Sequence, residues 1–270
     1  MNMINHLPLK LKEFLIDKEI EENTIGYSAA QVYQVKDLKS DKGWFLKILK
    51  KESTYYHLSY EKEVLCWLKG KVKVPELEFY LSNMDAEYLV MSSINGMMLS
   101  SPEAFEVEPR RTIKRFGENL KELHDIDINN CPFTQCLETK LAIATENVSN
   151  RRVDREDFLP EFKKYSPEEM LNCLKDNQPE QQQVFTHGDY TLPNLILDEE
   201  KIGFIDLGLS GISDPYLDLA VAVKSIRMNV NLYQMNHILD ELMKIFYVSY
   251  GLTKVDEKKI AYYLMLDDLF

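Results

Sequence analysis

The segment HGDYTLPN, residues 187–194, holds the densest group of side chains able to do chemistry. Asp189 and Asn194 lie on a turn-rich stretch between two apolar runs, and Asp206 follows twelve positions after Asn194 in GFIDLG. An amide oxygen and a carboxylate suit a hard divalent cation such as Mg²⁺, which takes oxygen ligands and also needs phosphate oxygens. Asp189 is then left to accept the proton of an attacking hydroxyl. The spacing predicts a phosphoryl-transfer centre with Asp189 as base and with Asn194 and Asp206 as metal ligands.

The stretch NLILDEEKIGFID, residues 194–206, reads as a hairpin whose DEEK turn brings Asn194 and Asp206 side by side. An alternative is a hairpin whose carboxylates only cap backbone amides. A metal-dependent hydrolase is disfavoured, because a cluster of histidine ligands is missing from the sequence. We expect His187 to organise the loop through hydrogen bonds.

A second pair of ionisable residues falls on apolar faces upstream. Lys47 lies between apolar neighbours on the face of the strand WFLKILK, and Glu61 falls on the apolar stripe of a helix expected over 55–69. Burying either charge alone costs several kcal/mol, and pairing them removes most of that cost. A strand lysine paired with a helix glutamate is the arrangement of protein kinases. The alternative is two separate side chains that extend to water.

Strand signals dominate the first third of the chain and helix signals the rest. Strands are expected in residues 24–50, with a turn at KDLKSDKG, and again in VPELEFYLSN and AEYLVMSSI. Short strands return at QVFTHG, NLILD and KIGFIDLG. Helices are expected at roughly 110–124, 167–176, 215–228, 232–249 and 256–269. This order predicts two lobes joined near residues 92–96, with a charged functional loop at about 145–168.

Asp214 and Asp218 belong to the helix that begins near residue 215. Asp214 is expected to cap this helix, with Pro215 in its first position. Asp218 either bonds backbone groups around the Asp189 loop or only favours the helix dipole.

Composition limits the partners and the compartment. The chain has 270 residues and a formal net charge of −12, which repels nucleic acid and anionic membranes and favours cationic ligands if the acids cluster. Solubility alone is the alternative explanation of that charge. We expect no signal peptide and no membrane-spanning run. The four cysteines have no zinc or haem spacing and are expected to be reduced thiols, which predicts a cytoplasmic protein.

HGDYTLPN, FIDLG and GISDPYLDLA together resemble the aminoglycoside phosphotransferase and choline kinase superfamily, and most closely the aminoglycoside 3′-phosphotransferases, or kanamycin kinases. The resemblance runs nearly end to end, through VYQV, FLKI, YEKEVLCWLKGKVKVP, LHDIDINNCPF, VFTHGD and YYLMLDDLF. It implies an α+β, bilobal protein-kinase-like fold. A small β-rich N-terminal nucleotide-binding lobe would span 1–95. A larger, mainly helical catalytic and acceptor-binding lobe would span 96–270, with a helical insertion at about 130–183.

The resemblance also implies roles for individual residues. On the nucleotide side, Lys47 would contact the α- and β-phosphates of ATP or GTP and Glu61 would hold Lys47. Phe45 would cover the purine, Ser28 would approach the phosphates, and backbone atoms of Ser92 and Ile94 would read the adenine edge. The acceptor side would use Asp154, Glu156, Asp157, Glu161, Asp268 and the terminal carboxylate of Phe270. For Ser28 the alternative is that Gly26-Tyr27-Ser28 forms an ordinary turn without a role at the phosphates. For the acids of residues 154–161 the alternative is a solvated loop face that binds no acceptor.

The implied function is Mg²⁺- and ATP-dependent transfer of the γ-phosphoryl group to a hydroxyl, the 3′-OH, of an aminoglycoside antibiotic, which would give antibiotic resistance. The expected partners are that small cationic substrate and the nucleotide, without nucleic acid or membrane, on a monomer or homodimer. Leu209 replaces an arginine usual in the kanamycin-kinase pattern, and Met228 and Asn229 replace expected acids. Another amine-bearing alcohol or sugar is therefore an alternative acceptor. A nucleotide-binding pseudokinase is disfavoured because every member of the Lys, Glu, Asp, Asn, Asp set is present.

Overall fold

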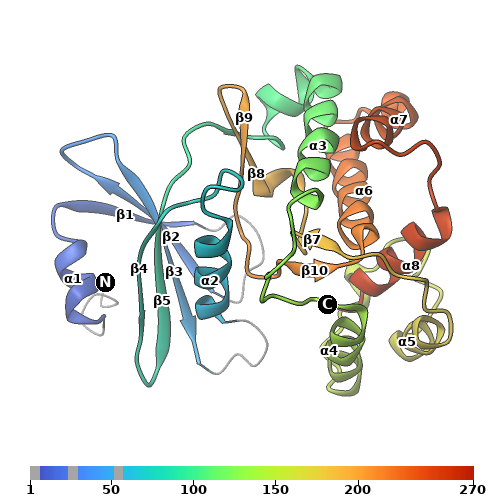
Figure 1. Cartoon of the computed structure of the whole chain (residues 1–270), viewed down its shortest axis with the longest axis horizontal. Helices are drawn as coiled ribbons and strands as arrows, with labels where there is room; N and C mark the ends of the chain where they lie inside the picture. Colours follow the sequence, from blue (N-terminus) through green and yellow to red (C-terminus); the bar gives the residue numbers. More distant parts are fainter. Residues whose placement is uncertain (1–6, 24–29, 52–56) are drawn as a thin grey trace. The chain divides into compact units, whose positions relative to one another are not determined.

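The structure, a computed structural model, describes residues 7–23, 30–51 and 57–270. The chain divides into two compact units (Figure 1): Met1–Asn95 with Gly203–Gly208, and Gly96–Ile202 with Leu209–Phe270. Among the described residues, none of the helices is both long enough and apolar enough to cross a membrane. The first unit is built on a β-sheet and the second is mainly helical, so the fold is the predicted α+β, kinase-like one.

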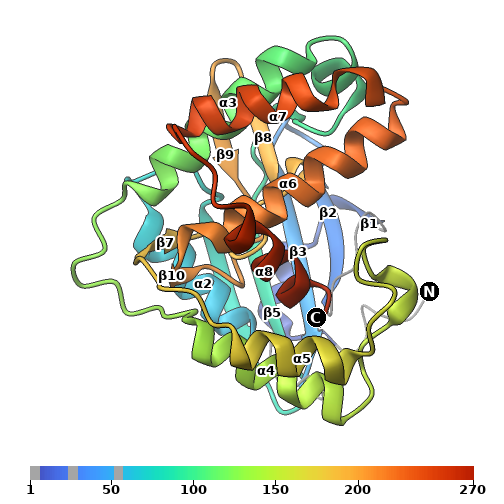
Figure 2. The same ribbon diagram turned by 90° about the vertical axis from the view of Figure 1, so that its right-hand side faces the viewer.

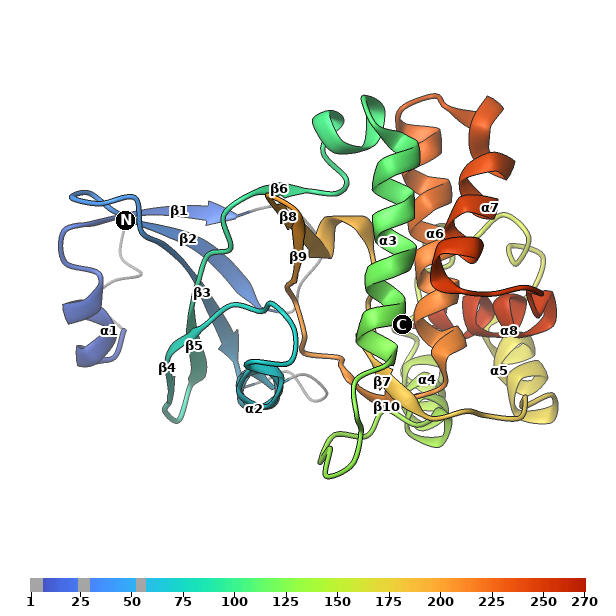
Figure 3. The same ribbon diagram turned by 45° about the horizontal axis from the view of Figure 1, so that its top comes forward.

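The first unit contains a five-stranded antiparallel sheet in the order β1-β2-β3-β5-β4. Its strands are β1 (Lys18–Asn23), β2 (Gln31–Asp37), β3 (Gly43–Lys50), β4 (Leu77–Ser82) and β5 (Ala86–Ser92), and its helices are α1 (Leu9–Phe14) and α2 (Leu58–Leu68). Leu46 and Ile48 of β3 pack with Leu11 of α1 in one buried cluster. Because side chains alternate along a strand, Lys47 points to the other face of the sheet, on which α2 packs. Figure 3 shows α2 beside β3 and β5.

The second unit joins six α-helices to short strands. The helices are α3 (Pro109–His124), α4 (Leu137–Ser149), α5 (Pro167–Asp176), α6 (Pro215–Leu232), α7 (Leu239–Tyr250) and α8 (Glu257–Asp267). The strands are β6 (Met97–Met98), β7 (Val184–Thr186), β8 (Leu195–Asp198), β9 (Lys201–Phe204) and β10 (Gly211–Ser213), and the last two residues of β9 are counted with the first unit. β7 pairs with β10, and β6 with β8.

Close helix packing explains one glycine of this unit. Figure 2 shows α3 alongside α7, and the two helices pack against each other. A Cβ atom on Gly117 of α3 would lie 2.6 Å from the backbone oxygen of Phe246 in α7. Glycine therefore lets the two backbones approach in the core that supports β7.

Several element bounds differ from the sequence predictions. α1 and β1 were not predicted, and α4 occupies the start of the stretch expected to be a loop from about residue 145. α6 continues to Leu232 because Ile226 and Val230 extend its buried stripe, and α7 begins only at Leu239. The remaining loop contains one turn of 3₁₀-helix, Arg155–Asp157.

Candidate active site

The loop that follows β7 is bent at Gly188. Gly188 has a φ of +84°, and a Cβ there would lie 2.1 Å from the backbone oxygen of Leu209, so a larger residue does not fit. The N–H groups of His187 and Gly188 donate to the two carboxylate oxygens of Asp218, at 2.7 and 2.8 Å. Asp218 is fully buried in α6. The first of the two predicted roles of Asp218, bonding the backbone of this loop, is confirmed.

Asp218 also anchors a short chain of buried side chains. His124 Nε2 lies 3.0 Å from Asp218 Oδ2, and His124 Nδ1 lies 2.8 Å from the hydroxyl of Tyr250. An ionised carboxylate only accepts hydrogen bonds, so a neutral imidazole here carries its proton on Nε2, and Nδ1 accepts from Tyr250. Burial raises the pKa of Tyr250, and nearby acids such as Asp218 add to the rise, which keeps this hydroxyl protonated. The loop that holds Asp189 is thus tied to the ends of α3 and α7.

Asp189 and Asn194 lie next to each other within this loop. The amide nitrogen of Asn194 donates to Asp189 Oδ2 at 2.8 Å and to the Asp189 backbone oxygen at 3.0 Å. The N–H of Asp189 donates to His187 Nδ1 at 3.3 Å, which confirms the loop-organising role predicted for His187. Because the Asn194 nitrogen faces Asp189, its amide oxygen points away from that carboxylate and suits a hard cation.

The predicted pair of Lys47 and Glu61 is confirmed. Lys47 Nζ lies 2.7 and 2.9 Å from the two carboxylate oxygens of Glu61, whose side chain is 1% exposed. The same ammonium group lies 2.7 Å from Asp206 Oδ1, on a side chain that is 42% exposed. One lysine therefore bridges a buried carboxylate and a solvated one.

Asp206 sits on a strained part of the chain. Its φ is +60°, a left-handed value that non-glycine residues seldom adopt. The segment before it is fixed, because Phe204 N donates to Lys73 O at 2.9 Å and Gly203 packs on Ile94. In the described ranges, groups of three or more His, Cys, Asp or Glu able to hold a metal are absent. The oxygen donors of Asp206 and Asn194 fit Mg²⁺ by their chemistry.

The other residues predicted for the nucleotide belong to the first unit. Phe45 lies on β3, two positions before Lys47, and Ser92 ends β5 opposite Trp44. The N–H of Ser92 donates to Glu76 O at 2.8 Å, so this N–H is already engaged within the first unit. Ile94 packs on Gly203, as described above. Ser28 and the Gly26-Tyr27-Ser28 turn lie outside the described residues.

The residues predicted to bind the acceptor differ in whether they already form hydrogen bonds or ion pairs within the chain. Asp154 accepts the N–H of Glu156 at 2.9 Å, and Glu156 and Asp157 are exposed in the 3₁₀ turn. Glu161 pairs with Arg227 at 3.2 Å. These acids belong to the same exposed stretch of loop.

Asp268 is held by its own unit. It accepts the N–H of Leu159 at 2.7 Å, and it pairs with Lys224 Nζ at 3.1 Å. Burial raises the pKa of Asp268, although Leu159 and Lys224 oppose part of the rise. Phe270 at the chain end is half-exposed, and its ring centroid lies 5.4 Å from Lys140 Nζ.

Two lysines near the chain end were not predicted as site residues. Lys224 on α6 also lies 2.6 Å from Asp267, and although burial lowers its pKa, the two acids raise it above the ordinary value overall. Lys140 on α4 is buried, and burial lowers its pKa against the opposing charges of Asp218, Asp267 and Asp189. The sequence feature that could have identified Lys140 as a buried lysine is its place on the apolar stripe of α4, next to Leu141.

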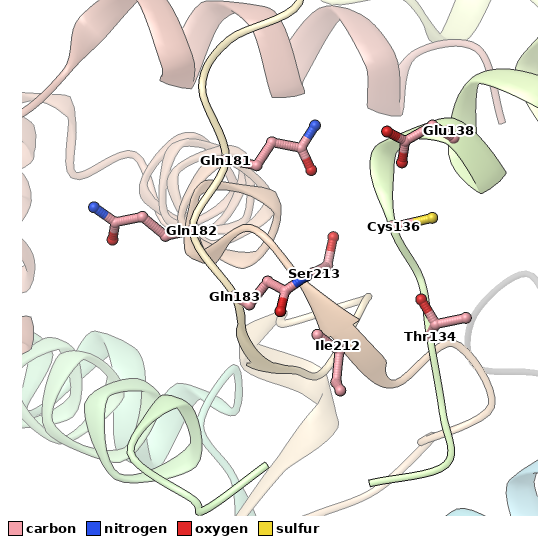
Figure 4. Close-up of a pocket in the computed structure, with 8 residues that line it drawn as sticks. All are labelled: Thr134, Cys136, Glu138, Gln181, Gln182, Gln183, Ile212 and Ser213. Carbon is pink, nitrogen blue, oxygen red and sulfur yellow. The ribbon is translucent and has the colours of Figure 1, made fainter. Parts of the chain in front are cut away.

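A small polar cavity of about 330 Å³ lies where β10 and the start of α4 meet. In Figure 4, three consecutive glutamine side chains line one part of it, and residues preceding or opening α4 line another. Its lining consists of Thr134, Cys136, Glu138, Gln181, Gln182, Gln183, Ile212 and Ser213. These residues differ from the predicted site residues.

Comparison with known proteins agrees with the phosphoryl-transfer chemistry predicted from the sequence. Residues 19–237 match the model of the phosphotransferase enzyme family. An aminoglycoside 3′-phosphotransferase of Niallia circulans is 36% identical over 266 residues, which cover 97% of each chain, and one of Enterococcus faecalis is 32% identical over the same length and shares. The crystal structure of a type VIII aminoglycoside 3′-phosphotransferase aligns with a TM-score of 0.81 at 26% identity, covering 97% of both chains. The chain therefore belongs to the phosphotransferase enzyme family, in the group of the aminoglycoside 3′-phosphotransferases.

Proposed function

We propose that the protein transfers the γ-phosphoryl group of ATP to the 3′-hydroxyl of an aminoglycoside and so confers resistance to that antibiotic. The observation that carries this proposal is the Asp189–Asn194 pair on a loop fixed by a buried carboxylate, in a chain that also holds the Lys47–Glu61–Asp206 cluster. Relatives that match over 97% of the chain support the acceptor class.

In the proposed reaction the chain positions the reactants and compensates their charge. Asp189 accepts the proton of the acceptor hydroxyl, the oxygen attacks the γ-phosphorus, and the bond to the β-phosphate oxygen breaks to leave ADP. Lys47, held by Glu61, neutralises phosphate charge. Asn194 and Asp206 would hold Mg²⁺, which would supply positive charge to neutralise the phosphates.

We assign nucleotide binding to residues 1–95 and acceptor binding to residues 96–270. In the first, Phe45, Ser92 and Ile94 would surround the base of ATP, with GTP as the other candidate donor. In the second, the insertion at about 130–183 would supply the exposed acids Glu156 and Asp157, which suit a polycationic acceptor. The reaction would take place in the cytoplasm, where nucleoside triphosphates are made and kept.

Leu209 and Met228 favour a second candidate, a kinase of an amine-bearing alcohol or sugar with fewer charges. Leu209 is 40% exposed and lies beside Gly188 of the catalytic loop, and Met228 is exposed on α6. An exposed apolar side chain next to the base does not pair with a charged group of the acceptor.

A coupled assay of ADP release separates these candidates. Kanamycin, tobramycin as a 3′-deoxy analogue, choline and a sample without acceptor would be compared with Mg·ATP. We expect turnover with kanamycin and only background with tobramycin. Turnover with choline alone would select the second candidate, and background with every acceptor would overturn both.

Replacing the base tests the assignment of Asp189. Asp189→Asn keeps an oxygen that can accept from the Asn194 amide, so the loop should persist. We expect kcat to fall by about 10²–10⁴-fold, the usual contribution of a general base, with the affinity for ATP unchanged. Asp176→Asn, at an exposed position that ends α5, is the matched control and should retain wild-type activity. Wild-type turnover in Asp189→Asn would refute the assignment.

A further inference from the structure

The N-terminus of α2 is capped by a residue from another strand. The helix begins at Leu58, and within the described part of the chain the N-cap residue His57 makes no side-chain capping bond. The carboxylate of Glu87 on β5 instead accepts the N–H of Leu58 at 2.7 Å and that of Ser59 at 3.3 Å. Two of the four N–H groups that a helix leaves unpaired at its start are thus satisfied across 29 and 28 positions of sequence.

Glu87 is well placed to hold the helix rigidly to the sheet. It is 6% exposed, and it pairs with Leu49 of β3 in the β3–β5 register, in which Lys47 pairs with Leu89. Its negative charge at a helix N-terminus is favourable, because the N–H groups there carry partial positive charge. His57 Nδ1 also lies 3.5 Å from Glu87, on the solvent side.

The position of α2 sets the geometry at Lys47. Glu61 is the fourth residue of the helix, one turn from Leu58, so a shift of the helix start would carry its carboxylate away from Lys47. In kinases the lysine–glutamate pair must be in place for phosphoryl transfer, and it is controlled by the position of this helix. A local cap such as Ser or Asp at residue 57 would accept from the N–H of Ser59 or of Tyr60 without joining the helix to the sheet.

We propose that Glu87 is a positioning residue for phosphoryl transfer: by pinning the start of α2 to β5, it keeps Glu61 on Lys47. This inference rests on the proposed function, in which Lys47 binds the nucleotide phosphates. Glu87 acts through Glu61 and Lys47 and does not touch the nucleotide itself.

Three variants separate positioning from simple helix capping. Glu87→Ala removes the cap and the link to β5. His57→Asp combined with Glu87→Ala restores a local cap to the helix but leaves its start without the hydrogen bonds to Glu87 of β5. Glu63→Ala removes an exposed glutamate from the same helix and is the control.

The measurements are the melting temperature, the affinity for the non-hydrolysable analogue AMP-PNP with Mg²⁺ by calorimetry, and KM for ATP and for kanamycin. We expect Glu87→Ala to weaken AMP-PNP binding and to raise KM for ATP about tenfold, the factor for one lost hydrogen bond to a charged group. KM for kanamycin should not change. The double variant should regain the melting temperature and keep the nucleotide defect.

Recovery of both stability and AMP-PNP affinity in the double variant would overturn the proposal, because Glu87 would then be only a cap. If Glu87→Ala does not fold, the double variant alone decides between the two outcomes. A wild-type protein that binds AMP-PNP but releases no ADP with any acceptor would count against the proposed acceptor. The calorimetric comparison would still test Glu87 in that case.

Discussion

Replacing Lys47 with methionine should destabilise the protein through the acid that it leaves behind. Glu61 is 1% exposed on its side chain, and Lys47 is its counter-charge at 2.7 and 2.9 Å. Removing one member of a buried ion pair costs about 3–5 kcal/mol, because the remaining buried charge loses its counter-charge. Asp206 is 42% exposed, so the loss of its contact with Lys47 adds at most about 1 kcal/mol. The expected decrease in melting temperature is on the order of 10 °C.

A second substitution should restore stability. In Lys47→Met with Glu61→Met, two apolar side chains replace the pair, and such exchanges are often neutral or stabilising. We therefore expect the double variant to unfold within about 1 kcal/mol of the wild type, although it should lack phosphotransferase activity. Lys39→Met is a control in the same unit, because Lys39 pairs with Asp17 at 2.6 Å on the surface, where water and salt screen the attraction.

Thermal and urea denaturation at pH 7, followed by circular dichroism, measure all four proteins. A loss in Lys47→Met no larger than in Lys39→Met would refute the account of Glu61 as a desolvated charge. A double variant no more stable than Lys47→Met would refute it as well.

Gly188→Ala should cost at least about 3 kcal/mol, because the added Cβ meets the backbone oxygen of Leu209 in addition to the strain of a positive φ. Gly70→Ala, at a similar φ of +81° but with open space around it, should cost only about 1 kcal/mol. Equal losses of unfolding free energy in the two variants, measured by urea denaturation, would contradict the contact at Gly188. Tyr262→Phe loses the hydrogen bond to Leu174 O, at 2.9 Å, and should be about 1 kcal/mol less stable at pH 9. Burial raises the pKa of Tyr262 to about 12, so the stability contributed by the protonated phenol is present below pH 10 and is lost as the pH rises to 12. The difference in unfolding free energy between the wild type and Tyr262→Phe should therefore narrow between pH 10 and 12. A constant difference would exclude the ionisation of Tyr262 as the source of this pH dependence.

Much of the Lys47–Glu61–Asp206 cluster was predictable because two strong local patterns define it. Lys47 and Glu61 each interrupt an apolar face, and the cost of burying a lone charge favoured a pair over two separate side chains that extend to water. The NLILDEEKIGFID hairpin was likewise visible, and it forms as β8 and β9. The strand signal of β1 was missed because Glu19, Glu21 and Glu22 give it little apolar alternation.

The packing around the chain end was less predictable, since its contacts join residues far apart in sequence. The apolar positions Leu137, Leu141, Ala144 and Val148 of α4 follow helical spacing, but the charged loop expected from about residue 145 overlapped the end of this helix. Nothing local shows that Lys224 would meet Asp268, 44 positions away, or that Asp268 would be buried there. Such pairs follow from the packing of α6 against the end of the chain.

The chain of contacts from Tyr250 through His124 to Asp218 makes the His124 ring a spectroscopic reporter. Its two nitrogens have different partners, at 2.8 and 3.0 Å, so the neutral ring is held in one tautomer, which ¹⁵N chemical shifts distinguish. Asp218 bonds the backbone N–H groups next to Asp189, and a rearrangement of that loop would therefore change the signal of a ring buried one contact away. Selective histidine labelling would thus follow the loop during substrate binding without any change to a residue that touches the substrate.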